Sequence, residues 1–362
     1  MIFGGKTVMN DFSKDKMSAY EAQKTAHWIS QGPVVFQVAR FMIKSGLLEA
    51  VSQSGEQGLS IAEAAEKCGL SEYGVQVLFE SSLTMGVLLC RDGRYFCSKA
   101  GWFLLNDEMV RVDMDFNHDV NYLGMSRIDE AVREGRPAGL EFFGKWKTIY
   151  EALPHLPEQV KKSWFAFDHY YSDNSFPEAL GILFGNGAEN ILDVGGNTGR
   201  FALEAVAYNP NAHVTVMDLP GQIEMMRRNI VGRCGCERIH GFPADLLDAE
   251  AVFPEGFDTI WMSQFLDCFS SREVVSILSR AAASMSSASR LYIMESFWDR
   301  QPYDTASFAL TAISLYFTVM ANGNSKMYRY SDMLDCIRRS GLEVERCIDN
   351  VGKCHTILIC RK

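Results

Sequence analysis

The residues best suited to chemistry follow a buried strand, Asn190-Ile-Leu-Asp-Val194, and begin with a glycine-rich turn. Gly195, Gly196 and Gly199 let the backbone turn sharply and approach a ligand that any side chain would block. A second strand ends in Asp218, 23 residues after Gly195. A carboxylate at that strand end can accept hydrogen bonds from both ribose hydroxyls of a nucleoside. The spacing predicts a nucleoside-containing ligand at the ends of these strands.

The identity of the loop residues distinguishes between cofactors that share such a turn. Asp193-Val-Gly-Gly-Asn-Thr-Gly199, followed by Asp218-Leu-Pro220, is typical of S-adenosylmethionine (SAM) rather than NAD. An NAD-dependent enzyme stays open as an alternative, although its loop normally follows a strand near the start of the chain. A glycine turn without a ligand is the purely structural interpretation. The residues of this loop expected to bind SAM, or its product S-adenosylhomocysteine (SAH), are Asp193, Gly195, Gly196, Gly199, Asp218 and Leu219.

Length, composition and charge limit the class of protein. The chain has 362 residues, of which 47% are hydrophobic and 22% charged. A chain of this length is long enough for two domains, because cores tend to divide beyond roughly 250–300 residues. The formal net charge of −10 argues against a nucleic-acid partner, which normally requires a basic face.

Neither a membrane span nor a metal site is expected. No run of about 18 apolar residues predicts a transmembrane helix, and the first residues lack the pattern of a secretory signal. The ten cysteines are scattered through predicted elements, which is typical of a reducing compartment. Cys234-Gly-Cys236 and Cys354-His355 are too sparse for a four-ligand zinc site. We therefore expect a cytoplasmic protein with no metal.

The first hundred residues have the pattern of a winged helix. A long helical segment occupies residues 18–50, and Ser60 with Glu63 forms a capping box that opens a second helical region. Ser71 begins a third. Two short strand-like runs follow, separated by Arg91-Asp-Gly-Arg94, whose Asp-Gly pair is a strong hairpin signal.

A winged helix often binds DNA, but the charge of this one favours another use. Residues 1–110 hold 10 Lys and Arg against 12 Asp and Glu, and a DNA-binding domain needs several cationic phosphate contacts. We expect this domain to pack against a second copy of the chain, as a homodimer.

From about residue 185 onward, strands alternate with helices, which predicts a doubly wound, mostly parallel α/β sheet of seven strands. The last two strands lie close together and are expected to form an antiparallel hairpin. Ligands of such sheets bind beyond the carboxyl ends of the strands. The expected domains are an all-helical winged-helix domain over 1–105, a helical pocket region over 106–180 and a SAM-binding domain over 181–362. The expected strands are 190–194, 213–218, 238–243, 257–262, 290–295, 342–349 and 355–361.

With these elements in place, residues 20–362 resemble the SAM-dependent small-molecule O-methyltransferases that carry an N-terminal winged-helix dimerisation domain. This family includes plant phenylpropanoid and flavonoid enzymes and bacterial polyketide-tailoring enzymes. Gly241-Phe-Pro-Ala-Asp245 is similar to the end of the family's third strand, and Phe167–Ser175 is similar to its Phe-Asn-x-x-Met-Ser helix. The resemblance implies that Asp245 contacts the adenine amino group. It also adds Ser172, Leu246, Ser263 and Gln264 to the expected cofactor-binding residues.

The catalytic segment departs from the family pattern. Ser263-Gln-Phe-Leu-Asp-Cys-Phe-Ser270 resembles the family's Leu-His-Asp-Trp-Ser, whose histidine is the general base. Aligned without gaps, Asp267 replaces that histidine. Glu295 falls on the first of two framing acids, and the second falls near Ser325, where no carboxylate is present. His169, on the helix expected to line the pocket, is the reserve base.

The replacement leaves four interpretations of Asp267 open. A free aspartate, with a pKa of about 3.9, is a poor base for a phenol near 10, but burial beside Glu295 can raise its pKa. Asp267 is then a tuned base or an orienting group. Alternatively, the acceptor needs no strong base, or the protein has exchanged methyl transfer for other chemistry or for SAM binding alone. Finally, Asp267 simply caps the helix region at Ser270 while another residue catalyses.

The expected substrate-binding residues come from helices rich in aromatic side chains. At helical spacing such residues also fit a plain core, so both interpretations stand. Asn322 and Asn324, in the loop after a helix at 307–321, can hydrogen-bond an acceptor, and His118 lies on a helix expected to roof the site. The expected set is His118, Trp164, Phe167, Tyr171, Phe317, Met320 and Asn324.

These residues predict a homodimeric, SAM-dependent methyltransferase whose acceptor is a hydroxyl of an aromatic or polyketide-like small molecule. The alternatives are a C- or N-methyltransferase of the same fold, or a SAM-binding member without methyl transfer, including a winged-helix regulator. No nucleic-acid or membrane partner is expected.

Overall fold

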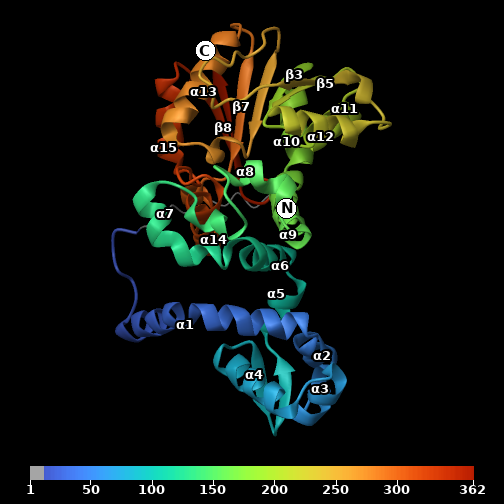
Figure 1. Ribbon diagram of the computed structural model, residues 1–362, viewed down its shortest axis with the longest axis vertical. Helices are drawn as coiled ribbons and strands as arrows, with labels where there is room; N and C mark the ends of the chain where they lie inside the picture. The colour runs from blue at the N-terminus through green and yellow to red at the C-terminus, as the bar shows by residue number, and fades with distance from the viewer. Residues whose placement is uncertain (1–11) are drawn as a thin grey trace. The chain divides into compact units, whose positions relative to one another are not determined.

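The computed structural model describes residues 12–362 and divides into two compact units. One unit ends at His118, and the other comprises Asp119–Lys362. Figure 1 shows the helices and strands of both units and labels many of them.

The N-terminal unit is mainly helical, with one hairpin. The turn residues Asp92 and Gly93 have φ angles of 49° and 72°, the left-handed conformation that a two-residue type I′ turn requires at both positions. Ser60 and Glu63 form the expected capping box. The hairpin pairs Leu88 with Cys97 through Arg91 with Arg94, so the prediction of helices followed by a hairpin is confirmed. The elements are α1 (Ala19–Lys44), α2 (Leu47–Gln53), α3 (Ile61–Cys68), α4 (Glu72–Thr84), β1 (Leu88–Arg91), β2 (Arg94–Cys97), α5 (Lys99–Asn106) and α6 (Glu108–Phe116).

The second unit is built on a seven-stranded sheet in the order β5-β4-β3-β6-β7-β9-β8. The first five strands of this order run parallel, whereas β9 is antiparallel to both β7 and β8. The predicted sheet and its antiparallel edge are confirmed. The strands are β3 (Asn190–Val194), β4 (His213–Asp218), β5 (Ile239–Pro243), β6 (Thr259–Ser263), β7 (Arg290–Glu295), β8 (Glu343–Val351) and β9 (His355–Arg361).

Helices cover both faces of this sheet (Figure 1). The central strands β3 and β6 are buried on both sides, which explains why they read as continuous apolar runs. One core lies under α10, α11 and α12, and the other under α13 and α15. These helices are α10 (Phe176–Gly185), α11 (Arg200–Tyr208), α12 (Pro220–Ile230), α13 (Ser271–Ser284) and α15 (Tyr330–Arg339).

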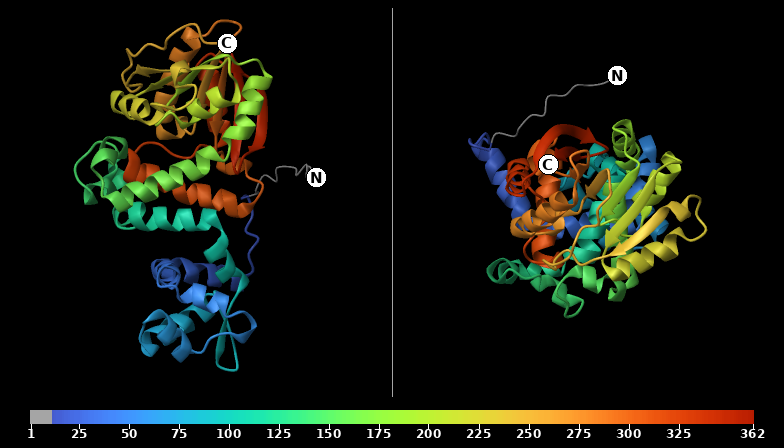
Figure 2. Two further views of the ribbon diagram at one scale, coloured as in Figure 1. Left: turned by 90° about the vertical axis from the view of Figure 1, so that its right-hand side faces the viewer. Right: turned by 90° about the horizontal axis from the view of Figure 1, so that it is seen from above.

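Further helices of the second unit lie near the carboxyl ends of the parallel strands. Among them, α9 and α14 lie side by side (Figure 2), and Trp164 Nε1 donates to the Tyr316 hydroxyl at 2.7 Å across them. Met320 is fully buried, and an added Cβ at Gly139 would lie 2.7 Å from its sulfur. The helices are α7 (Ile128–Glu134), α8 (Ile149–Ala152), α9 (Glu158–Asp173), α14 (Asp304–Tyr316) and the π-helical turn Phe317–Ala321 that continues α14.

The segment Asp304–Ala321 is the one helix among residues 12–362 that is long and apolar enough to cross a membrane, with a mean hydropathy of 1.2. The sequence did not predict this segment, because its apolar residues do not form one uninterrupted run. In the structure 44% of this segment is buried inside the protein, and its last turn packs against α7. Length and composition alone do not distinguish a span from such a core helix.

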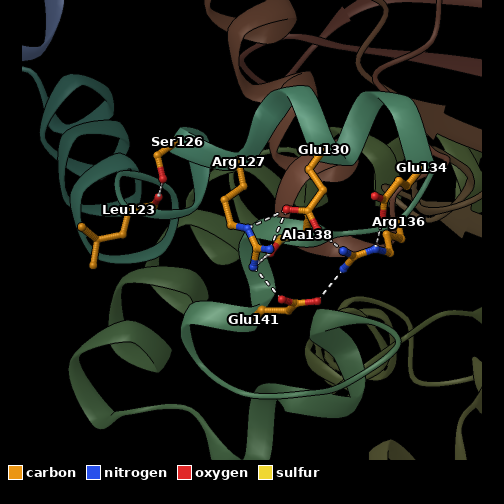
Figure 3. A network of polar contacts seen from close by, with 8 residues as sticks. All are labelled: Leu123, Ser126, Arg127, Glu130, Glu134, Arg136, Ala138 and Glu141. Carbon is orange, nitrogen blue, oxygen red and sulfur yellow. Dashed lines mark hydrogen bonds and ion pairs between the residues drawn. The ribbon is translucent and has the colours of Figure 1, made fainter.

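A network of ion pairs restrains the segment 127–141, which includes α7 (Figure 3). Arg127 pairs with Glu130 and Glu141, and Arg136 pairs with Glu130, Glu134 and Glu141. Single surface pairs contribute little, but a shared network restrains the segment more firmly.

The Arg136 backbone packs directly against Gly323, whose φ is +89°. A Cβ there would lie 2.6 Å from the Arg136 nitrogen. The network therefore restrains the loop that follows the π-helical turn.

We expect Met320→Ala to lower the free energy of unfolding by about 2–5 kcal/mol, because it leaves a cavity in the helical layer. Urea-induced unfolding measures the loss. Leu315→Ala, on the exposed side of α14 (41% exposed), is the control and should change stability much less. Equal losses in the two variants would contradict the packing role of Met320.

Candidate active site

The glycine turn after β3 has the geometry predicted from its sequence. Gly195 and Gly199 both have a φ of 76°, which L-residues rarely adopt. A Cβ at Gly195 would lie 2.9 Å from Phe265 Cε2, and one at Gly199 would lie 2.6 Å from Met226 Cγ. The turn therefore requires glycine for both its backbone conformation and its close contacts.

Two carboxyl groups lie beside this turn. Asp193 is 3% exposed, and its Oδ2 has no hydrogen-bond partner. Asp218 accepts from the Asn197 amide at 2.8 Å and from the Leu219 amide at 2.7 Å. Burial, followed by the charge of Asp218, raises the pKa of Asp193 to about 8, and burial also raises the pKa of Asp218. Such carboxyl groups favour a ligand that brings hydroxyl donors or positive charge.

Unsatisfied polar atoms gather around the ends of β3, β6 and β7. Buried polar atoms normally have hydrogen-bond partners, because leaving them unpaired is costly. Asn197 and Gln264 also have left-handed φ angles of 48° and 47°, and strain of this kind concentrates at functional sites. The unpartnered atoms are Asp193 Oδ2, Asn197 Oδ1, Ser263 Oγ, Gln264 Nε2 and Glu295 Oε2.

The other expected cofactor residues have different surroundings. Asp245 is exposed after β5, where its Oδ1 accepts from the Leu247 amide at 2.9 Å. Leu246 is 7% exposed and belongs to the core under α13. Ser172 donates to Asp173 Oδ1 at 3.0 Å, near the end of α9. Their roles in cofactor binding stay predictions.

Asp267 lies in the short 3-10 helix Leu266–Cys268 that follows β6 and is 6% exposed. Burial raises its pKa to about 6, against the lowering effect of hydrogen bonds from the Cys268 thiol and nearby amides. The cap of α13 comes from Ser270, which forms a capping box with Glu273. The interpretation of Asp267 as a helix cap is therefore wrong, since another residue fills that position.

Glu295 ends β7 and holds the segment that carries Asp267. Its Oε1 accepts from the Phe265 amide at 3.0 Å and from the Leu266 amide at 2.8 Å. Burial, followed by the charge of Asp267, raises the pKa of Glu295 well above its usual range. This arrangement makes Glu295 a positioning group for the loop beside Asp267.

Sequence reasoning missed two tyrosines near Asp267. The Tyr150 hydroxyl donates to Cys268 Sγ at 3.0 Å, and the Cys268 thiol lies 3.5 Å from Asp267 Oδ1. Burial raises the pKa of Tyr150 and of Tyr316 well above 10, and the charge of Asp267 adds to both shifts. These residues come from α8 and α14, and no sequence spacing links them to the loop after β6.

Asp168 is a third missed residue, although a signal for it existed. It occupies the position where the family motif has asparagine, between Phe167 and His169. Burial, followed by the charges of Asp173 and Asp267, raises its pKa to about 7. An ionisable residue in place of an amide at this motif position was a detectable departure.

His169, the expected reserve base, has local partners. Its Nδ1 lies 3.9 Å from Asp173 Oδ1, and its ring stacks on Phe165 with centroids 5.9 Å apart. Burial lowers its pKa. These contacts account for its place on α9, and its role as a base stays a prediction.

The expected aromatic wall residues are largely buried and pack in pairs. Phe167 and Tyr171 have ring centroids 4.9 Å apart, and Tyr316 and Phe317 have centroids 5.2 Å apart. Trp164 is 7% exposed, and its Nε1 donates a hydrogen bond to the Tyr316 hydroxyl. Trp164 and Phe317 both contact Tyr316, and the charge of Asp267 is among the causes that raise the Tyr316 pKa.

Asn322 contacts the loop that carries Asp267, and Asn324 contacts Asn322. Asn324 is exposed, and its amide donates to Asn322 Oδ1 at 3.1 Å. Asn322 Nδ2 donates to the Cys268 carbonyl at 2.6 Å, and its Oδ1 also accepts from the Ser325 hydroxyl at 2.8 Å. Asn322 therefore holds the loop beside Asp267, and the role of Asn324 in acceptor binding stays a prediction.

His118 lies in the N-terminal unit. Its ring stacks on Phe36 with centroids 6.5 Å apart, and its Nδ1 lies 3.4 Å from Gln37 Nε2. Its expected role above the pocket stays a prediction. Within residues 12–362, no group of three or more His, Cys, Asp and Glu side chains is arranged to hold a metal ion.

Two family models match the chain. A Dimerisation2-like domain matches residues 23–95, and an O-methyltransferase domain matches residues 178–336. The chain belongs to the SAM-dependent O-methyltransferase family.

Curated relatives cover most of this family member. L-tyrosine C(3)-methyltransferase of Streptomyces lavendulae is 22% identical, with 88% of this chain and 86% of the relative covered. Mitomycin biosynthesis 6-O-methyltransferase of the same species is 23% identical, with 90% of each covered.

Solved structures share the fold. The apo SAM-dependent methyltransferase SibL superimposes with a TM-score of 0.73 at 23% identity, covering 93% of this chain and 98% of that one. Human N-acetylserotonin methyltransferase, in complex with SAM, gives 0.66 at 17% identity, covering 98% and 99%.

The residues of this methyltransferase fit SAM. The unpartnered Asp193, Ser263 and Gln264 atoms offer both acceptors and a donor, and Gly195 gives the turn its left-handed backbone conformation. When bound, SAM supplies an electrophilic methyl group on a sulfonium. The buried carboxyls at the ends of β3 and β4 suit that cationic cofactor.

We expect Gly195→Ala to weaken SAH binding at least tenfold, because the new methyl group meets the Phe265 ring and disfavours the left-handed backbone. Isothermal titration calorimetry with SAH measures the loss. Gly221→Ala is the matched control, since a Cβ there meets nothing within 4 Å. Unchanged SAH affinity in the Gly195 variant would contradict this cofactor site.

Proposed function

We propose that this methyltransferase transfers the methyl group of SAM to a phenolic hydroxyl of an aromatic small molecule, with Asp267 as the general base. The observation that carries the proposal is the burial of Asp267, which is 6% exposed in the turn that Glu295 holds by two backbone amides, and this burial raises its pKa to about 6. This value is close to the 6.5 of an unperturbed histidine, the residue that the family uses in this position. A buried aspartate can therefore take over the proton transfer.

The division of labour follows from the contacts of the site. The acceptor hydroxyl loses its proton to the Asp267 carboxylate as the oxygen–carbon bond forms and the methyl–sulfur bond breaks. Glu295 keeps Asp267 in place through the two amides that it binds. Aromatic side chains suit a flat acceptor and keep water away from the base. Those proposed for this role are Tyr150, Trp164 and Tyr316.

The names of relatives support an aromatic acceptor. One of them, 3-hydroxy-5-methyl-1-naphthoate 3-O-methyltransferase of Streptomyces sahachiroi, is 23% identical over 84% of this chain. L-tyrosine C(3)-methyltransferase supports a second candidate, methylation of a ring carbon. A phenolate also carries negative charge on the ring carbons ortho to its oxygen. After methylation at such a carbon, that carbon loses its proton to water while the protonated Asp267 returns a proton to the oxygen, so the same residue serves either product. Mass spectrometry and NMR of the methylated product distinguish oxygen from carbon.

The pH profile tests Asp267 as the base. The carboxylate accepts a proton only when ionised, so we expect kcat/KM to rise as the pH increases through about 6 and then to level off. Asp267→Asn should lower kcat/KM by about 10²–10⁴-fold and remove this acidic limb. Asp335→Asn, on the exposed side of α15, is the control. Full activity of the Asp267 variant would point instead to an acceptor that needs no strong base.

We further propose that the N-terminal unit forms a homodimer interface. The match to a Dimerisation2-like domain supports this, as do exposed apolar side chains along α1. Tyr20 and Ile29 are both 75% exposed, and Val34 is 57% exposed. Apolar surface of this kind is typical of protein–protein contacts.

Replacing both Ile29 and Val34 with glutamate should shift the protein from dimer to monomer, because buried carboxylates oppose association. Size-exclusion chromatography with light scattering measures the mass. Val252→Glu, at another apolar position that is 75% exposed, should leave the dimer intact. A dimer that survives the double substitution would place the interface elsewhere.

A further inference from the structure

Cys268 connects the proposed base to a residue far away in the sequence. The Tyr150 hydroxyl donates to Cys268 Sγ at 3.0 Å, and the Cys268 thiol donates to Asp267 Oδ1 at 3.5 Å. Tyr150 comes from α8, 118 residues before Cys268. The three side chains therefore form a chain of hydrogen bonds that ends on the carboxyl group, and bonds in such a chain polarise and strengthen one another.

Other residues hold the backbone around Cys268. Asn322 Nδ2 donates to the Cys268 carbonyl at 2.6 Å, and the Tyr328 hydroxyl donates to the Phe269 carbonyl at 2.7 Å. Glu295 accepts from two amides of the same loop. Because these bonds fix the main chain, a small change of the Cys268 side chain should leave the loop in place.

A thiol acts on a carboxyl group without carrying charge itself. As a donor it stabilises the ionised form of the acid and so lowers the pKa of that acid. Burial raises the pKa of Asp267 to about 6, and the hydrogen bonds from the Cys268 thiol and nearby amides act against this rise. Burial also raises the pKa of the thiol well above its usual range. The thiol therefore keeps its proton near neutral pH and stays a donor.

The other ionisable groups that interact with the charge of Asp267 are acids from the surrounding elements. Burial raises the pKa of each, and the charge of Asp267 adds to the shift. These acids offer no positive charge, so hydrogen-bond donors favour the ionised form of Asp267 where these groups do not. The acids are Tyr150, Asp168, Glu295, Tyr316 and Tyr328.

We propose that Cys268 is a positioning residue of the reaction: its thiol, held by the Tyr150 hydroxyl, donates to the Asp267 carboxylate and sets the pH above which that carboxylate accepts a proton. This inference rests on the proposed function, in which Asp267 is the base. An uncharged donor suits this position, because a second carboxylate beside Asp267 would oppose its ionisation.

The pKa of Asp267 is measured by ¹³C NMR on the full-length protein, labelled at the aspartate side-chain carboxyl carbon and saturated with SAH, so that no acceptor is needed. The Asp267 signal is the one that Asp267→Asn removes. Cys268→Ala takes away the donor and should raise this pKa by about half a unit or more. Cys268→Ser restores a donor of similar size and should return the pKa toward the wild-type value. An unchanged pKa in the alanine variant overturns the inference.

Cys336→Ala is the matched control. Cys336 is 2% exposed, and its thiol donates to the Ser271 carbonyl at 3.8 Å rather than to a carboxyl group. Its loss should leave the pKa of Asp267 unchanged. A shift as large as that of Cys268→Ala would show that removal of a buried thiol acts through packing, and it would overturn the inference.

Tyr150→Phe tests the other end of the hydrogen-bond chain. It should raise the pKa of Asp267 by less than Cys268→Ala does, because the thiol then loses the contact that orients and polarises it. In the Cys268→Ala background the same substitution should change the pKa much less, since the connection is already broken. Equal shifts in the two backgrounds, zero included, would overturn the role of the chain.

A methylation assay with 2-naphthol separates this inference from the proposed function. If the Cys268 variants shift the pKa of Asp267 but Asp267→Asn keeps the acidic limb of kcat/KM, the hydrogen-bond chain is supported and the proposed function is overturned. If Asp267→Asn removes the acidic limb but the Cys268 variants leave the pKa of Asp267 unchanged, the base is supported and the role of Cys268 is overturned.

Discussion

The two hydrogen bonds that Glu295 Oε1 accepts from Phe265 and Leu266 connect the whole site. They fix the chain after β6, where the Phe265 ring lies against Gly195 and the next turn carries Asp267. The hydrogen bonds of Glu295 therefore fix the position of the glycine turn relative to the proposed base, Asp267. Burying the Glu295 carboxyl beside another acid costs free energy, and the two hydrogen bonds from the amides offset part of that cost.

Near these two hydrogen bonds, the second unit places several acidic side chains in surroundings that are wholly or partly buried. Asp193 and Asp218 lie at the ends of β3 and β4, and Asp168 and Asp267 lie nearer the aromatic helices. Burial raises the pKa of each, to about 8 for Asp193, about 7 for Asp168 and about 6 for Asp267. The first pair suits a nucleoside that is also cationic, and Asp267 suits the proton transfer proposed for it.

Local patterns predicted the elements that rely on local interactions. The capping box of Ser60 and the Asp92-Gly93 turn form within a few residues, so their side-chain chemistry is legible in the sequence. The strands were predicted well because buried parallel strands require continuous apolar runs. The contact between Asn322 and Cys268 was not legible in this way, because Asn324, two residues away, has the same chemistry and only the fold of the loop decides which of them reaches Cys268.

The sequence by itself therefore determined the order of elements, the glycine turn and the acid at the end of β4, since each depends on neighbouring residues or on a regular period. Only the tertiary structure decided what surrounds Asp267. Tyr150 lies 118 residues from Cys268, and Trp164 lies 152 residues from Tyr316, yet each pair forms a hydrogen bond. Such contacts arise from the packing of helices near the carboxyl ends of the strands, and the spacing of residues along the chain does not encode them.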